Sequence, residues 1–416
     1  MFEKVNSTII DLERWSVNKA LKAAPIIIAA IAICCLTSCA GNKPKPIPNT
    51  AMGFEEGMRA VASSLADQVE QSSLENRINR LGKIKIKKIA IDPFIDAESG
   101  YQVKANDRIA QIISEVMKNR FDIGEMEPKI LESAEYVLNG LVTVDGNRKD
   151  THKDTHKVLA TVFVKSSGEI VASSSALIKG FDTTPKEIYK DSPVFLKGED
   201  YKHQMESIRK PTGQTVNKEY LGSLTARSLQ VKGDSLYEHR DYKQSLAYYN
   251  QAANLGKGSQ LNILNGEFSN LMAQGEYKAS EDVYGRLLVV SLQETGEIAS
   301  NICFAPDKTV PLKSRISYYN IYMKKIAGLV VSRPGCKLKI VGHCSRTGTA
   351  AYNDRLSKER AVRIQAKMEG YAPGIISRST TEGRGFRENI VGTGKDDLTD
   401  LIDRRVEFIF YECAGK

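Results

Sequence analysis

The stretch LKIVGHCSRTGTAAYNDRLSKERA, residues 338–361, decides the fold of the C-terminal part of the chain. It begins with alternating side chains that place Leu338 and Ile340 on one face, which is typical of a strand. Gly342 ends this strand, a polar turn follows, and apolar residues then recur at helical spacing. The pattern predicts a strand, a turn and a helix that form a pocket at the end of the strand, with Arg360 on the helix.

A longer set of residues in this region resembles the OmpA-like, peptidoglycan-associated domain. That family has a Gly-His turn, a helix with Tyr-Asn-x-x-Leu-Ser-x-x-Arg-Ala, and a closing Gly-x-Gly and Arg-Arg-Val-Glu. The residues that match are Gly342, His343, Gly348, Tyr352, Asn353, Leu356, Ser357, Arg360, Ala361, Gly383, Gly385 and DRRVEF at 403–408. The resemblance covers about residues 296–413 of a predicted domain 296–416. It implies a β-α-β-α-β-β fold with a mixed sheet backed by helices.

The resemblance also implies a ligand, the diaminopimelate of the peptidoglycan stem peptide, a small zwitterion with carboxylate and ammonium groups. Arg360 matches the family's carboxylate-binding arginine, and Asn353 and Arg404 match other positions of the motif. Ser345 stands where the family has the aspartate that binds the ammonium group, and Asp354 is a candidate substitute. Because a hydroxyl binds ammonium more weakly than a carboxylate does, we expect reduced or rearranged wall binding, and we expect Ser345→Asp to strengthen it. The alternative is an OmpA-like scaffold without a ligand.

The chain of 416 residues is too long for one compact core and predicts two to four domains. With 26% charged and 41% hydrophobic residues, it is neither wholly disordered nor a polytopic membrane protein. Its net charge of +9 suits an anionic partner such as nucleic acid, anionic lipid or a cell-wall polymer. Cellular location has to decide among these partners.

The N-terminus has the pattern of a secretion signal. Lys22 precedes an apolar run, residues 23–35, which is too short to span a bilayer comfortably. The run ends in Leu-Thr-Ser-Cys, which resembles the bacterial lipobox and implies a signal peptide at 1–38, acylation of Cys39 and a lipidated tether at 39–52. Ala40 implies sorting to the outer membrane, where no nucleic-acid partner is expected. The alternative is an uncleaved amphipathic anchor.

Residues 53–181 have the pattern of an α/β unit, with a helix, a strand, a second helix and a strand meander. The segments IAIDPFID, AEYVLNGLVTV and SSGEIVASSSALIKG resemble the FlgO-like domain of bacterial envelope lipoproteins. This resemblance implies a periplasmic binding or assembly module. Residues 182–222 are rich in polar and turn residues and are expected to form a linker that can pack on its neighbours.

Residues 223–295 contain an internal repeat. The segments GDSLYEHRDYKQSLAYYNQAANL and FSNLMAQGEYKASEDVYGRLLVV superimpose at an offset of 35 residues, as from Tyr249 to Tyr284, close to a tetratricopeptide repeat (TPR). Small residues are expected to let paired helices approach, while tyrosines fill the gaps. These residues are Ser245, Ser280 and Ala252, with Tyr242, Tyr249, Tyr277 and Tyr284. The TPR-like segment is predicted either to bind a partner peptide or, because about two repeats are few, to act as a helical spacer.

Four cysteines follow Cys39, and all lie in the OmpA-like part, in a compartment that permits disulfides. Cys336 and Cys344 bracket one strand and are too far apart to pair. In the sheet that the resemblance implies, the last strand lies between the first and second, so Cys413 comes near Cys336 and Cys303 is the competing partner. We expect a bridge between Cys336 and Cys413, the alternative being four reduced core cysteines.

Enzyme motifs are absent from the sequence, which has no Gly-x-Ser-x-Gly and no His-Glu-x-x-His. His152 and His156 lack a third metal ligand, and GTGKDD at 392–397 departs from the phosphate-loop pattern. We therefore expect a binding protein without cofactor or metal, and not an enzyme.

The features together predict an outer-membrane lipoprotein on the periplasmic face of that membrane. Its OmpA-like domain would bind peptidoglycan and tether the envelope, and its TPR-like segment would bind a protein partner. The expected fold class is multidomain, with an α/β unit, a short helical segment and an OmpA-like domain. The alternative is an assembly or regulatory factor of a flagellar, secretion or other envelope machine, with wall binding incidental.

Overall fold

The computed structural model describes residues 46–78, 87–144, 155–256, 260–298, 300–390, 394–397 and 399–411. The predicted signal peptide, Cys39 and most of the tether lie outside these residues. The chain divides into two units, Met1–Pro46 with Asp67–Gly82, and Ile47–Ala66 with Lys83–Lys416. The described part of the first unit is Pro46 and the second half of helix α2 (Phe54–Ile78). Within the described ranges, no helix is both long and apolar enough to cross a membrane.

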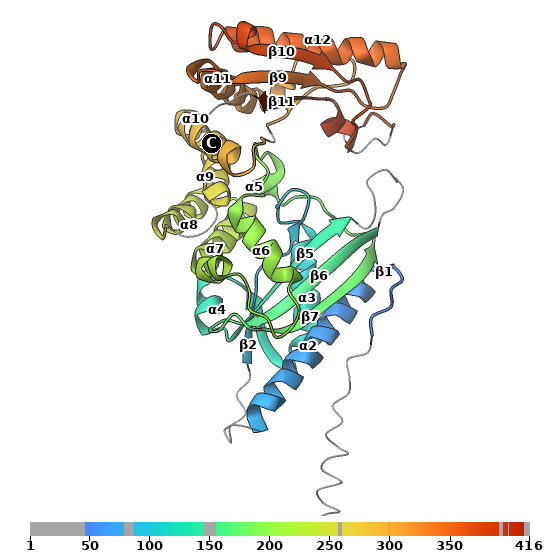
Figure 1. Cartoon of the computed structure of the whole chain (residues 1–416), viewed down its shortest axis with the longest axis vertical. Helices are drawn as coiled ribbons and strands as arrows, with labels where there is room; N and C mark the ends of the chain where they lie inside the picture. Colours follow the sequence, from blue (N-terminus) through green and yellow to red (C-terminus); the bar gives the residue numbers. More distant parts are fainter. Residues whose placement is uncertain are drawn as a thin grey trace, which may run out of the picture. The chain divides into compact units, whose positions relative to one another are not determined.

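The larger sheet combines parallel strands with an antiparallel meander (Figure 1). Its strands are β1 (Met52–Gly53), β2 (Lys87–Ile91), β3 (Ile95–Asp96), β4 (Phe121–Glu125), β5 (Tyr136–Val144), β6 (Thr155–Val164) and β7 (Ile170–Lys179). Their order is β1-β7-β6-β5-β2-β4, with β3 beside β5. β5, β6 and β7 form the meander, whereas β2 runs parallel to both β4 and β5. The expected helix, strand, helix and meander are present, and the FlgO-like assignment stays a prediction.

Side-chain periodicity explains the helices and strands of this region. β7 buries every second residue from Ile170 to Ile178, because only one of its faces meets the core. β5 is buried on both faces over most of its length. α3 (Ala105–Met117) buries Ile109, Ile112 and Ile113 along one face, and α4 (Pro128–Ser133) begins with a proline at its first turn, where no N–H is needed.

Residues 182–222 differ from the expected linker. They contain α5 (Glu187–Lys190), α6 (Glu199–Arg209) and the start of α7 (Lys218–Glu238). Tyr220 and Leu224 of α7 share a core with Val137 and Phe163 of the sheet. Few apolar residues are needed for each short helix to bury one face, so the segment keeps a polar composition although it packs on the sheet.

Two helix hairpins follow one another in the TPR-like segment. They are α7 with α8 (Tyr242–Asn254), and α9 (Gln260–Ala273) with α10 (Tyr277–Glu294). Ser245 Oγ donates to the carbonyl oxygen of Gly233 at 2.8 Å, and the buried Tyr249 ring lies against both Gly233 and Gly266. The expectation is wrong for Tyr277, which is 50% exposed because it begins α10 at the end of a hairpin. The hairpins suit a TPR-like segment, whose assignment stays a prediction.

Close packing at Tyr249 gives the first testable prediction. A Cβ at position 266 would lie 2.0 Å from a ring carbon of Tyr249. We expect Gly266→Ala to lower the free energy of unfolding by about 2–3 kcal/mol, because neither ring nor helix can move freely. Gly222→Ala is the matched control in α7, where nothing lies within 4 Å, and is expected to add about 0.5–1 kcal/mol. Equal midpoints for the two variants in urea unfolding would contradict this packing.

The smaller sheet has the element order that the OmpA-like resemblance implies. Its elements are β8 (Ile302–Cys303), α11 (Ile316–Ser332), β9 (Lys337–Gly342), α12 (Ala350–Glu369), β10 (Ser379–Gly383) and β11 (Arg405–Tyr411), with short 3-10 turns at Lys313–Arg315, Ile376–Arg378 and Thr399–Asp403. The strand order is β10-β9-β11-β8. β11 runs antiparallel to both β8 and β9, and β10 runs parallel to β9. This is a mixed β-α-β-α-β-β sheet with the last strand between the first two.

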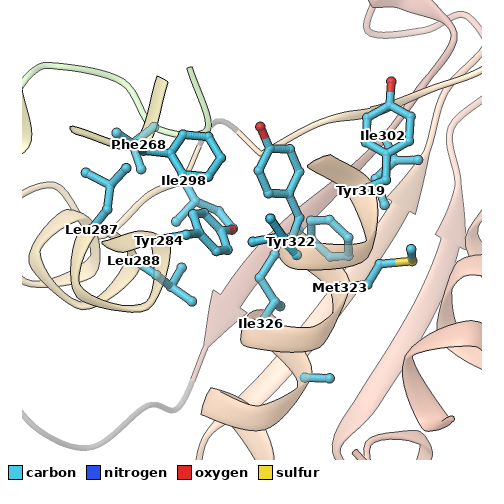
Figure 2. Packing of buried hydrophobic residues seen from close by; sticks show 14 of the residues in the cluster. Phe268, Tyr284, Leu287, Leu288, Ile298, Ile302, Tyr319, Tyr322, Met323 and Ile326 are labelled. Atoms are coloured by element: carbon cyan, nitrogen blue, oxygen red, sulfur yellow. The ribbon is translucent and has the colours of Figure 1, made fainter. Parts of the chain in front are cut away.

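Figure 2 shows a buried aromatic cluster to which α9, α10 and α11 all contribute. The ring centroids of Phe268 and Tyr284 are 5.8 Å apart, and those of Tyr284 and Tyr322 are 5.0 Å apart, within the range of favourable aromatic pairs. Ile298 and Ile326 lie beside these rings in the same cluster. The boundary expected at residue 296 therefore crosses a continuous core, and binding experiments need the chain on both sides of it.

Candidate ligand-binding site

The end of β9 and the start of α12 bring Arg360 to the edge of the smaller sheet. Gly342 ends the strand against α12, where a Cβ would lie 1.9 Å from the carbonyl oxygen of Ser357. The hydroxyl of Thr349 caps α12 by accepting a hydrogen bond from the Tyr352 backbone N–H at 3.3 Å. The glycine and the cap fix the helix on the strand, and Arg360 is carried on its buried face with 1% of its surface exposed.

The guanidinium of Arg360 is held by backbone carbonyls. Nε donates to the Lys308 oxygen at 2.8 Å, Nη1 to the His343 oxygen at 2.9 Å, and Nη2 to the Ala305 oxygen at 3.2 Å. The guanidinium carbon also lies 5.0 Å from the centre of the Phe304 ring, at cation–π distance. The residues around 304–308 therefore form a covering loop over Arg360.

No carboxylate in the described part of the chain accepts a hydrogen bond from Arg360. Its hydrogen bonds end on carbonyl oxygens and on the Cys344 thiol, and none ends on an acidic side chain. Burial lowers the pKa of Arg360, although a guanidinium stays charged at any physiological pH. Since buried charges in proteins are ordinarily paired, this cation favours an anionic ligand group.

Ser345 and Arg404 meet at the carboxylate of Asp396. Ser345 Oγ donates to Asp396 Oδ1 at 2.5 Å, and Arg404 Nη1 donates to the same oxygen at 2.5 Å. Ser345 and Arg404 are almost fully buried, whereas the Asp396 side chain is 22% exposed. The position that the family fills with an aspartate is thus occupied by a serine that contacts an aspartate from a distant loop.

The other two residues predicted at the site have different surroundings. Asn353 is buried and donates from Nδ2 to the carbonyl oxygens of Thr347 and Thr349, at 2.6 and 3.1 Å, so it holds the turn before α12. Asp354, the substitute suggested by sequence, forms an ion pair with Arg387 at 2.7 Å. Its negative charge is therefore matched by an arginine, as that of Asp396 is by Arg404.

A second polar cluster surrounds His343, which is 1% exposed. Its Nε2 lies 3.0 Å from Glu407 Oε1, and its Nδ1 lies 4.0 Å from Glu388 Oε2. The three side chains offer atoms within 4.8 Å of one another, a spacing that could hold a metal ion. However, Arg384 donates to both oxygens of Glu388 and Arg405 donates to Glu407 at 3.1 Å, so both carboxylates are neutralised. We interpret the cluster as an ion-pair network that fastens β11 to β9.

The Glu407 carboxylate gives a prediction for acid stability. Burial favours a raised pKa, but the contact with His343 and the charge of Arg405 lower the pKa of Glu407 from 4.5 to about 2. A folded-state pKa below the unfolded value means that the ionised group stabilises the fold above pH 4.5, and that this stabilisation is lost as pH falls from 4.5 toward 2. We expect Glu407→Gln to lower the free energy of unfolding by about 2–3 kcal/mol at pH 7, and very little near pH 2.

Urea unfolding of wild type and Glu407→Gln at pH 7, 5 and 3 checks this expectation. Glu359→Gln, which removes a largely exposed carboxylate from α12, is the control and should leave the pH dependence as it is. A stability difference between wild type and Glu407→Gln that stays constant from pH 7 to pH 3 would contradict the ion-pair interpretation.

The cysteines agree in part with the predicted bridge. Cys336 is disulfide-bonded, whereas Cys303 and Cys344 are free thiols, so Cys303 is not its partner and the alternative of four reduced cysteines is wrong. Cys413 lies outside the described residues, and its pairing with Cys336 stays a prediction. The register of β9 with β11 pairs the first residue of β9 with the last of β11. Burial raises the pKa of both free thiols to about 11, so they are protonated and unreactive at neutral pH.

Sequence reasoning missed Asp396 as a member of the site. It falls in the GTGKDD segment, residues 392–397, which departs from the phosphate-loop pattern and is therefore given no role. The sequence feature that could have indicated Asp396 is Ser345. Because a hydroxyl stands there where an aspartate is expected, another acidic residue should be sought near it.

No family model matches the sequence, and no curated protein matches it. Solved structures match about a quarter of the chain. The peptidoglycan-associated lipoprotein from Burkholderia pseudomallei is 18% identical, over 27% of this chain and 89% of that chain, with a TM-score of 0.24. The C-terminal domain of Helicobacter pylori MotB is 19% identical, over 27% and 85%, with a TM-score of 0.23. The cell wall anchor of the T6SS from Pseudomonas aeruginosa is 23% identical, over 26% and 74%, with a TM-score of 0.21. Similarity at this level assigns no function to the chain.

Proposed function

We propose that the protein is an outer-membrane lipoprotein that binds peptidoglycan non-covalently on the periplasmic side. Residues 296–416 bind the diaminopimelate of the stem peptide, and the lipid on Cys39 holds the other end in the membrane. The observation that carries this proposal is Arg360, a buried guanidinium whose described partners include no carboxylate. The TPR-like segment contributes a protein-binding surface, where Ile263 and Val289 line a pocket between α9 and α10.

A ligand carboxylate suits Arg360 because the guanidinium presents a fork of N–H donors to a planar anion. Since the side chain is 1% exposed, the ligand reaches it by displacing part of the covering loop. The carboxylate then replaces the carbonyl of Ala305 or Lys308 as a hydrogen-bond acceptor. This exchange replaces a bond between the guanidinium and a neutral carbonyl with a bond between two opposite charges, which adds Coulomb attraction in a buried site.

Co-sedimentation with purified sacculi tests the proposal. Protein that lacks residues 1–40 keeps every described element and has no lipid site. We expect it to pellet with sacculi in a saturable manner, and to stay in the supernatant without them. Failure to pellet at any sacculus concentration, while a known OmpA-like binder pellets, would refute wall binding.

The lipid anchor has its own test in the full chain. We expect Cys39→Ser to leave the outer-membrane fraction, because the thiol that receives the lipid is removed and one polar hydroxyl cannot anchor a protein. Ser38→Ala is a control that keeps the cysteine and a small residue before it. Association of Cys39→Ser with the outer-membrane fraction, with sacculi digested first, would contradict lipid anchoring.

The proposal describes a binding protein and assigns it no catalytic activity. Incubation of sacculi with the protein is therefore expected to release no soluble muropeptides. Release that grows with time and protein concentration would instead require an enzyme.

A further inference from the structure

Asp396 forms a polar cluster with Ser345 and Arg404, and it is the partly exposed member of the three. Ser345 Oγ and Arg404 Nη1 both donate to Oδ1 of Asp396, each at 2.5 Å. Arg404 is itself anchored, since its Nε donates to the Phe304 oxygen at 3.2 Å and its Nη2 to the Asp397 oxygen at 3.0 Å. The carboxylate of Asp396 is thus positioned by groups that are themselves held in place.

The backbone at Asp396 supports the same arrangement. Its φ of +57° is in the left-handed region, which few non-glycine residues adopt without a local constraint. Its N–H donates to Oδ2 of Asp400 at 2.9 Å, and Asp400 is fully buried. The loop therefore turns the Asp396 side chain toward Ser345 at some conformational cost.

The second oxygen of Asp396 is available for a ligand. Both hydrogen bonds from the described residues use Oδ1, and none of them ends on Oδ2. A carboxylate offers about four acceptor positions, so Oδ2 can accept from a further donor while Oδ1 keeps its two bonds. The Asp396 side chain is 22% exposed, so part of it faces solvent.

Asp396 and Arg360 act electrostatically on the same region. Among the causes that set the pKa of Arg360, burial comes first, and the charges of Arg404, Asp307 and Asp396 also contribute. Ser345 lies two residues after His343, whose carbonyl accepts from Arg360. The turn after β9 thus contacts the Arg360 guanidinium through His343 and the Asp396 carboxylate through Ser345, which suits a ligand that carries both charges.

We propose that Asp396 accepts the ammonium group of the ligand whose carboxylate binds Arg360, and that Ser345 positions Asp396. This inference rests on the proposed peptidoglycan binding. In this chain the acidic partner of the ammonium group comes from the loop between β10 and β11, not from the turn after β9. Ser345→Asp would then place a second carboxylate against Asp396, so it weakens binding instead of strengthening it, contrary to the sequence-based expectation.

Two nearby acidic residues compete for this role. Asp354 is paired with Arg387 at 2.7 Å, as Asp396 is with Arg404, and its side chain is 44% exposed. Asp307 accepts from the Tyr352 hydroxyl at 3.0 Å. Neither contacts Ser345 among the described residues, and Asp354→Asn provides a control with the same change of charge and size as Asp396→Asn.

The test measures co-sedimentation with sacculi for wild type, Asp396→Asn, Asp354→Asn and Ser345→Asp. We expect Asp396→Asn and Ser345→Asp to bind roughly tenfold more weakly or worse, and Asp354→Asn to bind within about twofold of wild type. The exchange of positions, Ser345→Asp with Asp396→Ser, restores one carboxylate at the turn and is expected to recover most of the affinity.

Each outcome separates this inference from the proposed function. If wild type binds sacculi and Asp396→Asn binds equally well, the role of Asp396 is wrong and wall binding stands. If wild type does not bind, the proposed function fails first. Thermal unfolding of each variant shows whether the fold is kept, and the exchanged double variant provides a decision should Asp396→Asn unfold.

Discussion

Asp92→Ala is expected to lower the free energy of unfolding by about 3–5 kcal/mol, the largest effect on stability predicted for this chain. Asp92 is 1% exposed and accepts from Arg227 Nη2 at 3.0 Å and Arg227 Nε at 3.1 Å. It also accepts from the Tyr220 hydroxyl at 2.7 Å. Among the described residues, removal of the carboxylate leaves the buried guanidinium with Asp200, at 3.3 Å, as its one acidic partner. Loss of one partner of a buried pair costs more than the pair contributes.

Asp122→Ala is the matched control for Asp92→Ala. Asp122 pairs with Lys88 at 3.0 Å, but its side chain is 58% exposed, so its loss should cost less than about 1 kcal/mol. Urea unfolding followed by circular dichroism compares the two variants with wild type. Similar shifts of the midpoint in both variants would show that Asp92 and Arg227 do not join the larger sheet to α7 as described.

Arg360→Ala is expected to weaken binding to sacculi by about 2 kcal/mol or more, roughly 30-fold, the largest effect on binding. The substitution removes the cation that meets the ligand carboxylate and leaves that carboxylate without its partner. Arg360→Lys keeps the charge but loses the fork of donors, and should bind with an intermediate affinity. The measurement is a co-sedimentation isotherm at fixed salt, because a net charge of +9 favours salt-dependent attraction to any anionic polymer.

Arg363→Ala controls for the change of charge, because Arg363 is exposed on the same helix. Since Arg360 also bonds to three carbonyls, thermal unfolding has to show that the variants remain folded. Equal affinity of Arg360→Ala and Arg363→Ala for sacculi would remove Arg360 from the site.

The sequence predicts the fold of the smaller sheet well because its motif residues lie where elements begin and end. Gly342 marks the end of β9, since no side chain fits against Ser357 there. Arg360 lies on the buried side of α12, as its position one turn after Leu356 predicts. Both features depend on contacts between β9 and α12, which follow one another in the sequence, so a local sequence pattern is enough to predict them.

Other features depend on distant contacts and could not be predicted. Asp396 meets Ser345 across 51 residues, through a left-handed backbone conformation that no pattern shows. The helices in residues 182–222 bury few apolar side chains, so their composition resembles that of a linker. The ion pair of Asp92 with Arg227, which fastens α7 to the larger sheet, likewise spans a long stretch of sequence.

Competition between sacculi and soluble stem peptides tests the central claim most directly. The protein without residues 1–40 is bound to sacculi and then challenged with a stem peptide that contains diaminopimelate, or with the same peptide containing lysine. The lysine side chain ends in an ammonium group but has no neighbouring carboxylate for Arg360. We expect the diaminopimelate peptide to displace wild-type protein at much lower concentration than the lysine peptide, and this preference to disappear in Arg360→Ala. Displacement by both peptides at the same concentration, or by neither, would contradict recognition of the zwitterion at this site.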